Sequence, residues 1–181
     1  MERVGTSIVN RMVRAAKLEP GVYEELERDT GATWEALLVV VIVSVAAGIG
    51  GLLAGEISGS AGVAITDFAV GVVLAAMAWA EWSLITYFIG TTLFKGTADY
   101  GELLRTIGFA YTPNILQIFA FIPILGGLLV LIGAIWALIA GVVAVRQALD
   151  FSTTKAILTV IIGWIIMLII TFILVMVQFT P

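Results

Sequence analysis

The sequence predicts an all-α membrane protein, a bundle of five transmembrane helices with the N-terminus in the cytoplasm and the C-terminus outside. Composition is the first reason, because the 181 residues are 61% hydrophobic and only 12% charged, with a mean hydropathy of +1.12. A water-soluble domain this apolar could not cover its surface, whereas a chain embedded in lipid need not. The lengths of the apolar runs and the distribution of the basic residues are the other two reasons.

Five apolar runs are long enough to cross a membrane, since a hydrocarbon core about 30 Å thick requires about 20 helical residues. The predicted spans are 34–55, 65–94, 103–122, 124–145 and 156–177. The second is longer than required, which predicts tilt, a kink, or an interfacial first turn around Asp67. The third contains Pro113, which leaves the carbonyl of Phe109 without its helical partner and should bend the helix.

The basic residues test this number of spans. With alternating topology the inner segments are 1–33, 95–105 and 146–155, and they contain all nine Lys and Arg residues. The positive-inside rule then places the N-terminus in the cytoplasm and Pro181 outside. Four or six spans would spoil this separation. The first long apolar run begins near residue 34, after a mixed-charge segment, so no secretory signal peptide is expected.

The chain divides into a polar N-terminal segment, 1–33, and a transmembrane domain, 34–181. From Val4 to Leu18 apolar residues recur at helical spacing, and three basic residues occupy the other side: Arg11, Arg14 and Lys17. Such a helix either lies on an anionic membrane surface or packs on the protein's own cytoplasmic face. After Pro20 a short acidic helix follows.

Composition also excludes several kinds of chemistry. The chain has no Cys and no His, so it lacks thiolate chemistry, the usual general base and the commonest metal ligand. We expect no enzyme and no nucleotide, metal or redox cofactor. The net charge of −4 provides no basic field for nucleic acid.

One candidate polar site lies within the predicted membrane. Glu81 is near the middle of the second span, where a charge costs about 2.5–3.5 kcal/mol on insertion scales. Asn114 and Gln117 are at comparable depth in the third span, just beyond Pro113. One interpretation is a site where Glu81 binds a cation or relays a proton. The other is a protonated Glu81 that hydrogen-bonds to these amides or to a carbonyl freed by the proline.

Small residues four apart form two candidate helix-packing ridges, because they let a second helix approach closely. The two ridges are Ala47, Gly51 and Gly55 in the first span and Gly133, Ala137 and Gly141 in the fourth. Several aromatic residues are expected to pack or contact lipid, with a hydrophobic ligand or lipid groove as the alternative: Trp79, Trp82, Tyr111 and Trp136.

An inner rim of basic residues is expected at the cytoplasmic ends of the helices: Arg105, Arg146 and Lys155. Such residues anchor helix ends among lipid headgroups and form marginal ion pairs. A protein partner that docks on this rim is the alternative.

Several short motifs, in this order and spacing, complete the pattern: Tyr-Glu-Glu-Leu-Glu-Arg-Asp at 23–29, Gly-Phe-Ala-Tyr-Thr-Pro at 108–113, Ile-Pro-Ile-Leu-Gly-Gly at 122–127, Ile-Trp at 135–136 and Ala-Val-Arg-Gln-Ala-Leu at 144–149. Over nearly its whole length the chain resembles a Yip1-domain membrane protein of the prokaryotic kind. The resemblance implies five transmembrane helices and a cytoplasmic N-terminus. Eukaryotic members are linked to vesicle traffic and small Rab-type GTPases, a partner not carried over to this chain. For prokaryotic members the resemblance implies a fold and a location without an established activity.

Together these observations favour a membrane scaffold or accessory subunit in the plasma or inner membrane. Its expected partners are membrane lipids and another membrane protein or further copies of itself. The alternative is a small transporter or channel that uses Glu81 beside the third helix bent at Pro113. No inverted repeat is apparent to support that alternative.

Overall fold

The computed structural model describes residues 7–55 and 61–179, and in these ranges the chain is helical, without strands. Its elements are α1 (Ile8–Ala16), α2 (Pro20–Arg28), α3 (Ala32–Ala54), α4 (Ala61–Phe88), the π-helix η1 (Ile89–Leu93), α5 (Tyr100–Ala110), the 3-10 helix η2 (Thr112–Phe119), α6 (Leu125–Ala148) and α7 (Thr153–Phe179). Arg3, Val4, Pro181 and most of the loop expected at 56–62 lie outside the described residues.

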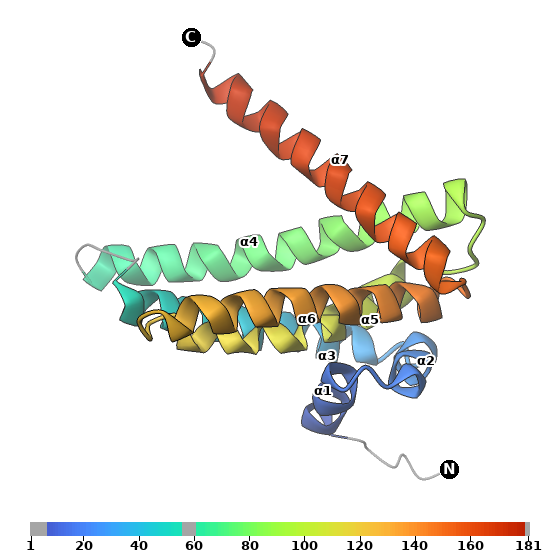
Figure 1. Cartoon of the computed structure of the whole chain (residues 1–181), viewed down its shortest axis with the longest axis horizontal. Coiled ribbons are helices and arrows are strands. Elements are labelled where there is room, and N and C mark those ends of the chain that lie inside the picture. Colours follow the sequence, from blue (N-terminus) through green and yellow to red (C-terminus); the bar gives the residue numbers. More distant parts are fainter. Residues whose placement is uncertain (1–6, 56–60, 180–181) are drawn as a thin grey trace.

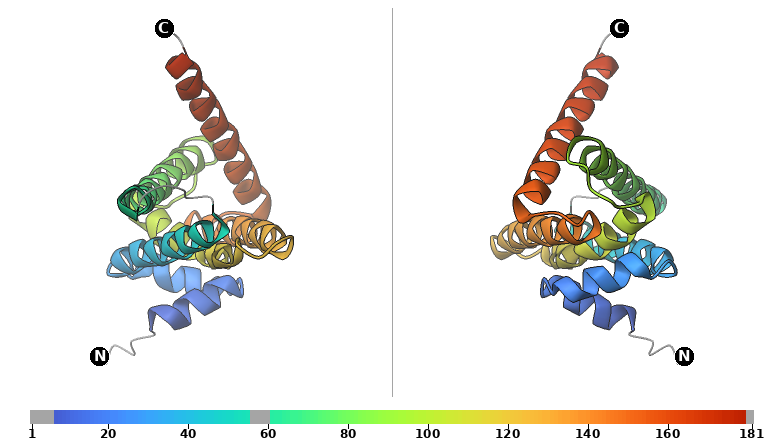
Figure 2. Two further views of the ribbon diagram at one scale, coloured as in Figure 1. Left: turned by 90° about the vertical axis from the view of Figure 1, so that its left-hand side faces the viewer. Right: turned by 90° about the vertical axis from the view of Figure 1, so that its right-hand side faces the viewer.

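The centre of the molecule is a layer in which α5 and η2 lie between α3 and α6 and pack on both (Figure 1). α4 packs on one side of this layer, against α3 and α5, and α1 and α2 cover the opposite side. The end-on views in Figure 2 show this order, with α4 and α7 diverging above the layer and α1 and α2 beneath it. α7 contacts α6, η1 and α4, and its C-terminal half stands away from the rest of the chain.

Within the described residues, four helices are long and apolar enough to cross a membrane: Ala32–Ala54, Thr66–Leu93, Leu125–Ala148 and Thr153–Ile170. They correspond to the first, second, fourth and fifth predicted spans. The protein is therefore an all-helical membrane protein.

The third predicted span is divided, because α5 ends at Ala110 and the chain continues as 3-10 helix from Thr112. Pro113 explains the change, since it has no N–H to donate to the carbonyl of Phe109. The Thr112 hydroxyl donates to that carbonyl instead, at 2.7 Å. The backbone group freed by the proline is thus satisfied locally, as burial in an apolar surrounding requires.

Two glycines hold η2 in the layer. A Cβ at Gly50 of α3 would collide with the carbonyl of Gln117. On the other side, a Cβ at Gly133 of α6 would lie 3.0 Å from the carbonyl of Pro113. Gly50 therefore lets α3 approach the η2 backbone more closely than any side chain would, and Gly133 permits a tight contact between α6 and η2.

The second span ends in the π-helical turn η1 rather than a simple kink. A Cβ at Gly90 in this turn would lie 2.5 Å from the Leu149 side chain, so the turn is shaped around that residue. Gly96, in the following loop, donates its N–H to the carbonyl of Gly90 at 3.0 Å. This bond fixes the loop that leads into α5.

A strained turn connects η2 to α6. Ile124 has φ 65° and ψ −55°, and the N–H of Leu125 donates to the carbonyl of Pro123 at 2.7 Å. Positive φ is costly for a β-branched residue, and this γ-turn geometry is uncommon. Ile124 is also 96% exposed, so packing does not compensate for the strain.

Candidate functional site

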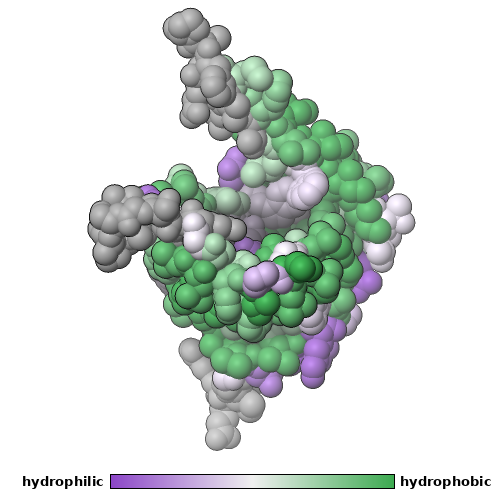
Figure 3. Space-filling view, turned by 60° about the vertical axis from the view of Figure 1, so that its left-hand side comes forward, coloured by the Kyte–Doolittle hydropathy of each residue, from purple (hydrophilic) through white to green (hydrophobic). Residues whose placement is uncertain are grey.

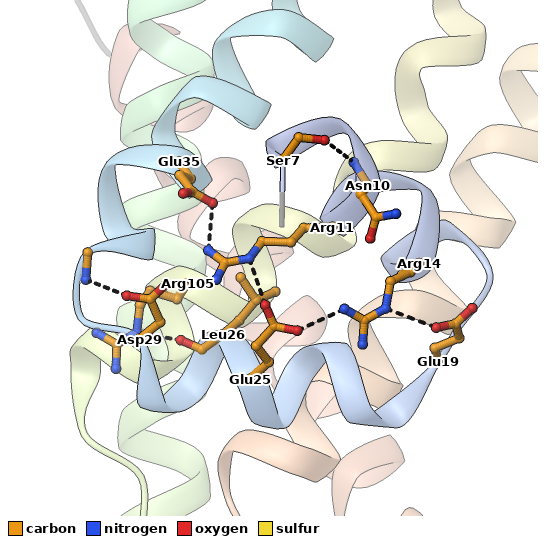
Figure 4. A network of polar contacts seen from close by, with 11 residues as sticks. Ser7, Asn10, Arg11, Arg14, Glu19, Glu25, Leu26, Asp29, Glu35 and Arg105 are labelled. Carbon is orange, nitrogen blue, oxygen red and sulfur yellow. Dashed lines mark hydrogen bonds and ion pairs between the residues drawn. The ribbon is translucent and has the colours of Figure 1, made fainter. Parts of the chain in front are cut away.

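The N-terminal segment folds around one buried arginine, Arg11 of α1 (Figure 4). Its guanidinium donates to three carboxylates from three places in the chain: Glu25 at 2.9 Å, Asp29 at 2.8 Å and Glu35 at 2.7 Å. The Arg11 side chain is only 10% exposed, whereas the three carboxylates are more accessible. Because its planar fork fixes several bonds at once, Arg11 ties α1 to α2 and to the first turn of α3.

Arg14 extends this network along α2. It donates to Glu25 at 2.8 Å and to Glu19 at 3.1 Å. Burial alone would raise the pKa of Glu25, but hydrogen bonds from Arg14 and Arg11 hold this pKa below its ordinary value. Glu25 is therefore the carboxylate that both arginines share.

Arg105 connects the N-terminal segment to the central layer. This buried side chain of α5 donates from Nε to the carbonyl of Leu26 at 2.9 Å and from Nη2 to the carbonyl of Glu27 at 2.6 Å. It thereby satisfies two carbonyls in the last turn of α2, where a cation also complements the helix dipole. Tyr23 of α2 is fully buried and donates to the carbonyl of Ala15 at 3.0 Å. Burial raises the pKa of this phenol.

α1 has the opposite orientation to that of a helix with its charges among lipid headgroups. Arg11 and Arg14 point toward the carboxylates of the protein itself, and the helix packs on its own bundle, against α2, α5, η2 and α6. The exposed face of α1 instead carries Val9 and Val13. Of the two interpretations of this helix, packing on the protein's own face is the arrangement in the structure.

The other two residues of the inner rim, Arg146 and Lys155, also make hydrogen bonds within the protein. The Arg146 Nε donates to the side chain of Gln147 at 3.0 Å, and Gln147 in turn donates to Glu24 of α2 at 2.9 Å. Lys155 Nζ donates to the carbonyl of Phe94 at 3.2 Å. The loop 94–99, the end of α6, the loop 149–152, the start of α7 and helix α2 consequently meet at one end of the bundle.

An apolar cavity of about 330 Å³ opens between α4, α6 and α7, with α5 and η2 as its floor. Its lining combines small and aromatic side chains: Ala78, Trp82, Ile107, Ala110, Tyr111, Asn114, Ala134, Ala137, Leu138, Gly141, Val160, Trp164 and Met167. Figure 3 shows a hollow in the otherwise apolar surface. A cavity of this size is at the lower end of the range for small-molecule sites, about 300–1,000 Å³.

A second cavity of about 290 Å³, the polar cavity, lies between α3, α4 and η2 and has five polar side chains in its lining. Its polar side chains are Ser44, Asp67, Tyr111, Asn114 and Gln117. Tyr111 and Asn114 line both cavities and therefore form the wall between them. Neither side chain makes a hydrogen bond within the described part of the chain.

The structure separates Glu81 from the polar residues expected near it. Asn114 and Gln117 line the cavity to which Asp67, not Glu81, contributes from α4. Glu81 is exposed and is two residues from both buried Trp79 and buried Ser83. At about 100° per residue, this spacing puts it on the opposite face of α4 from both. Pro113, Asn114 and Gln117 all belong to η2, in the third predicted span. Glu81 does not form one site with them.

The two ridges of small residues have mixed placements. In α3, Gly51 is buried, Ala47 lines the polar cavity and Gly55 is the left-handed C-cap of the helix with φ 76°. In α6, Gly133 packs on η2, whereas Ala137 and Gly141 line the apolar cavity. The closest approach on α3 is at Gly50, adjacent to the predicted ridge.

The aromatic residues also have different roles. Trp82 and Tyr111 line the apolar cavity. Trp79 is buried and donates its indole N–H to the carbonyl of Leu104 at 3.0 Å, and Trp136 donates to the carbonyl of Ala16 at 2.7 Å. Sequence reasoning missed Trp164, which joins the cavity from α7; its spacing within an all-apolar helix carried no signal.

Comparison with known proteins gives this fold its family. A model of the Yip1 domain matches residues 19–174, which is most of the chain. The match includes α2 and Arg105 as well as the residues that line both cavities. No curated protein and no solved structure matches the chain. The chain belongs to the Yip1-domain family of membrane proteins.

Proposed function

We propose that this protein is a membrane scaffold or accessory subunit that binds other membrane proteins through exposed helix faces, without catalysis of its own. The observation that carries the proposal is the position of Glu81 on the outer face of α4. It lies in an exposed apolar stripe with Val73, Met77, Leu84 and Phe88. Within the described ranges, its carboxylate has no hydrogen bond or ion pair.

A carboxyl group in this position requires a partner. Glu81 is near the middle of the apolar stretch Thr66–Leu93, where an uncompensated charge costs about 2.5–3.5 kcal/mol. Intramembrane carboxyl groups normally face a bundle interior or a wet cavity. A helix of a second protein that presents a hydrogen-bond donor at this depth would supply both the donor and the apolar contact.

The test is extraction of the full chain from its native membranes into lipid nanodiscs, followed by mass spectrometry of everything that co-purifies. We expect a partner protein in a stoichiometric amount. Glu81→Leu removes the polar group and should reduce recovery of the partner at least tenfold, whereas Glu81→Gln keeps the hydrogen-bonding capacity and should retain most of it. Asp67→Asn is the matched control, because this acidic residue lies on the same helix but lines the polar cavity.

Two results would contradict the proposal. One is a monomer or homo-oligomer that carries only lipid. The other is a partner whose recovery is the same with Glu81→Leu as with the native chain. The transporter alternative has no comparable support, because Glu81 does not share a cavity with Asn114 and Gln117.

We propose in addition that the chain crosses the cell membrane five times, with α5 and η2 together as the third span and the N-terminus in the cytoplasm. All nine basic residues then lie on the inner side. The chain has no Cys, so single cysteines can report topology by their reaction with a membrane-impermeant maleimide on intact cells. Five spans predict that Ile124→Cys reacts from outside and that Ser152→Cys does not. If α5 and η2 did not cross, the two results would be reversed.

A further inference from the structure

The two cavities that share Tyr111 and Asn114 have the properties of one binding site. We propose that this site binds a neutral single-chain lipid, with its apolar chain between α4, α6 and α7 and a hydroxyl or carbonyl group at Tyr111 and Asn114. The inference is independent of the proposed scaffold function, because it uses a different face of α4.

The shape and lining of the apolar cavity favour a lipid chain. It lies between α4, α6 and α7, and Figure 3 shows a hollow in the apolar surface. Because α4 and α7 separate toward the C-terminal end of α7 (Figure 1), a ligand can enter from the bilayer. On α6, the small residues Ala137 and Gly141 leave space for a ligand. Trp82 and Trp164 line the cavity from α4 and α7. A volume of about 330 Å³ suits one chain rather than a two-chain phospholipid, since it is near the lower limit for ligand sites, about 300 Å³.

The polar end of the ligand is assigned from two side chains without partners. Among the described residues, Tyr111 and Asn114 are the only polar side chains that line the apolar cavity apart from the indoles of Trp82 and Trp164. Each can donate and accept hydrogen bonds, yet neither has a hydrogen bond among the residues that the structure describes. In surroundings poor in water, an unpaired polar group is costly. A hydroxyl or carbonyl group of a ligand would satisfy both.

The charges of the residues that line the cavities favour a ligand with an uncharged polar end. In the part of the chain that the structure describes, no Lys or Arg lines either cavity, so a carboxylate or phosphate would be buried without a counter-charge. The polar cavity, which shares Tyr111 and Asn114 with the apolar cavity, also has the carboxyl group of Asp67 in its lining. This carboxyl group would disfavour an anion further.

The experiment uses the full chain in phosphatidylcholine nanodiscs and a photoactivatable probe, hexadecanol that carries a diazirine in its chain. After irradiation, mass spectrometry locates the adducts. We expect labels on the cavity-lining segments 78–82, 134–141 and 164–167, and unlabelled hexadecanol should compete with them to saturation. Labelling spread along the exposed faces of α4 and α7, without competition, would overturn the proposal, because it would mean that the probe only dissolves in the surrounding lipid.

Two variants test the two halves of the site. Gly141→Leu fills the apolar cavity, and its Cβ meets no atom within 4 Å, so it should fold and lose the competable label. Gly127→Leu is the matched control on the same helix, because its Cβ also meets nothing and it lies outside the cavity. Equal labelling of these two variants would refute the site.

Tyr111→Phe tests the polar end and keeps the proposal falsifiable if the cavity-filling variant does not fold. Loss of one hydrogen bond should weaken hexadecanol competition about two- to tenfold. Competition by hexadecane, which has no hydroxyl group, should be unchanged. If Tyr111→Phe alters neither ligand, or both equally, then the hydroxyl group is not bound at this residue.

Discussion

Arg11 offers the sharpest test of how the N-terminal segment is held. Arg11→Met keeps most of the apolar stem of the side chain and removes all three ion pairs, which are 2.7–2.9 Å long. Hydrogen bonds to charged groups contribute about 1.5–3 kcal/mol each when well shielded. Here the carboxylate side chains are 31–41% exposed, so water screens each pair and can rehydrate the carboxylates. We therefore expect a total loss of about 2–3 kcal/mol, below the 3–5 kcal/mol for a fully buried pair.

Hydrogen exchange in nanodiscs measures this loss directly. If α1 opens locally to exchange, a loss of about 2–3 kcal/mol makes its protected amides exchange about 30- to 150-fold faster. Lys17→Met is the control, because Lys17 is a basic residue at the exposed end of the same helix. Exchange of α1 that is no faster in Arg11→Met than in Lys17→Met would refute the reasoning. It would mean that apolar packing around Met12 and Ala15, not the network, holds α1.

Three further outcomes follow from the described geometry. Ile124→Gly relieves strain of about 1–3 kcal/mol at a cost in chain entropy of about 0.5–1 kcal/mol, so thermal unfolding in mild detergent should show equal or higher stability. A lower melting temperature would exclude strain at this turn. Gly50→Ala should destabilise the protein by about 1–3 kcal/mol through overpacking against η2, whereas Gly127→Ala should be nearly neutral; equal melting temperatures would contradict the close approach. The folded-state pKa of Glu25 is below its ordinary value of 4.5, so its stabilisation is complete above pH 4.5 and is lost as the pH falls through the lowered value. Glu25→Gln should remove that part of the acid sensitivity of α1 exchange, and an unchanged pH profile would count against the shared carboxylate.

Much of the fold is predictable because membrane insertion acts on averages over long segments. Hydropathy located the four long helices. For the fourth span the predicted ends, 124–145, are within a few residues of the ends of α6, Leu125–Ala148. The interruption near Pro113 was also predictable, since it follows from the missing N–H of proline. The preceding break at Tyr111 and the 3-10 geometry were not, because they depend on the close packing of α3 and α6 on η2.

The residues around the candidate sites were harder to predict, because depth in the membrane can be estimated from sequence but direction around the helix axis cannot. Glu81, Asn114 and Gln117 have comparable depths, yet Glu81 faces away from the other two. A helix that is apolar on all sides has no amphipathic stripe to reveal which face is buried. For α1 the stripe was visible, but the carboxylates that neutralise Arg11 are 14 to 24 residues away in the chain. Only the tertiary fold brings them together.

The short length of α5 has a mechanical consequence. Arg105 in this helix donates hydrogen bonds to the last turn of α2. Tyr111, the C-cap of α5, contributes to the wall between the two cavities. The two residues are separated by less than two helical turns, about 9 Å along a nearly rigid rod. A ligand that tilts α5 at Tyr111 must therefore also move Arg105 and the hydrogen bonds that it donates to α2. Hydrogen exchange of α2, measured with and without hexadecanol in the nanodiscs, would register that transmission, and identical exchange would show that the rod stays still.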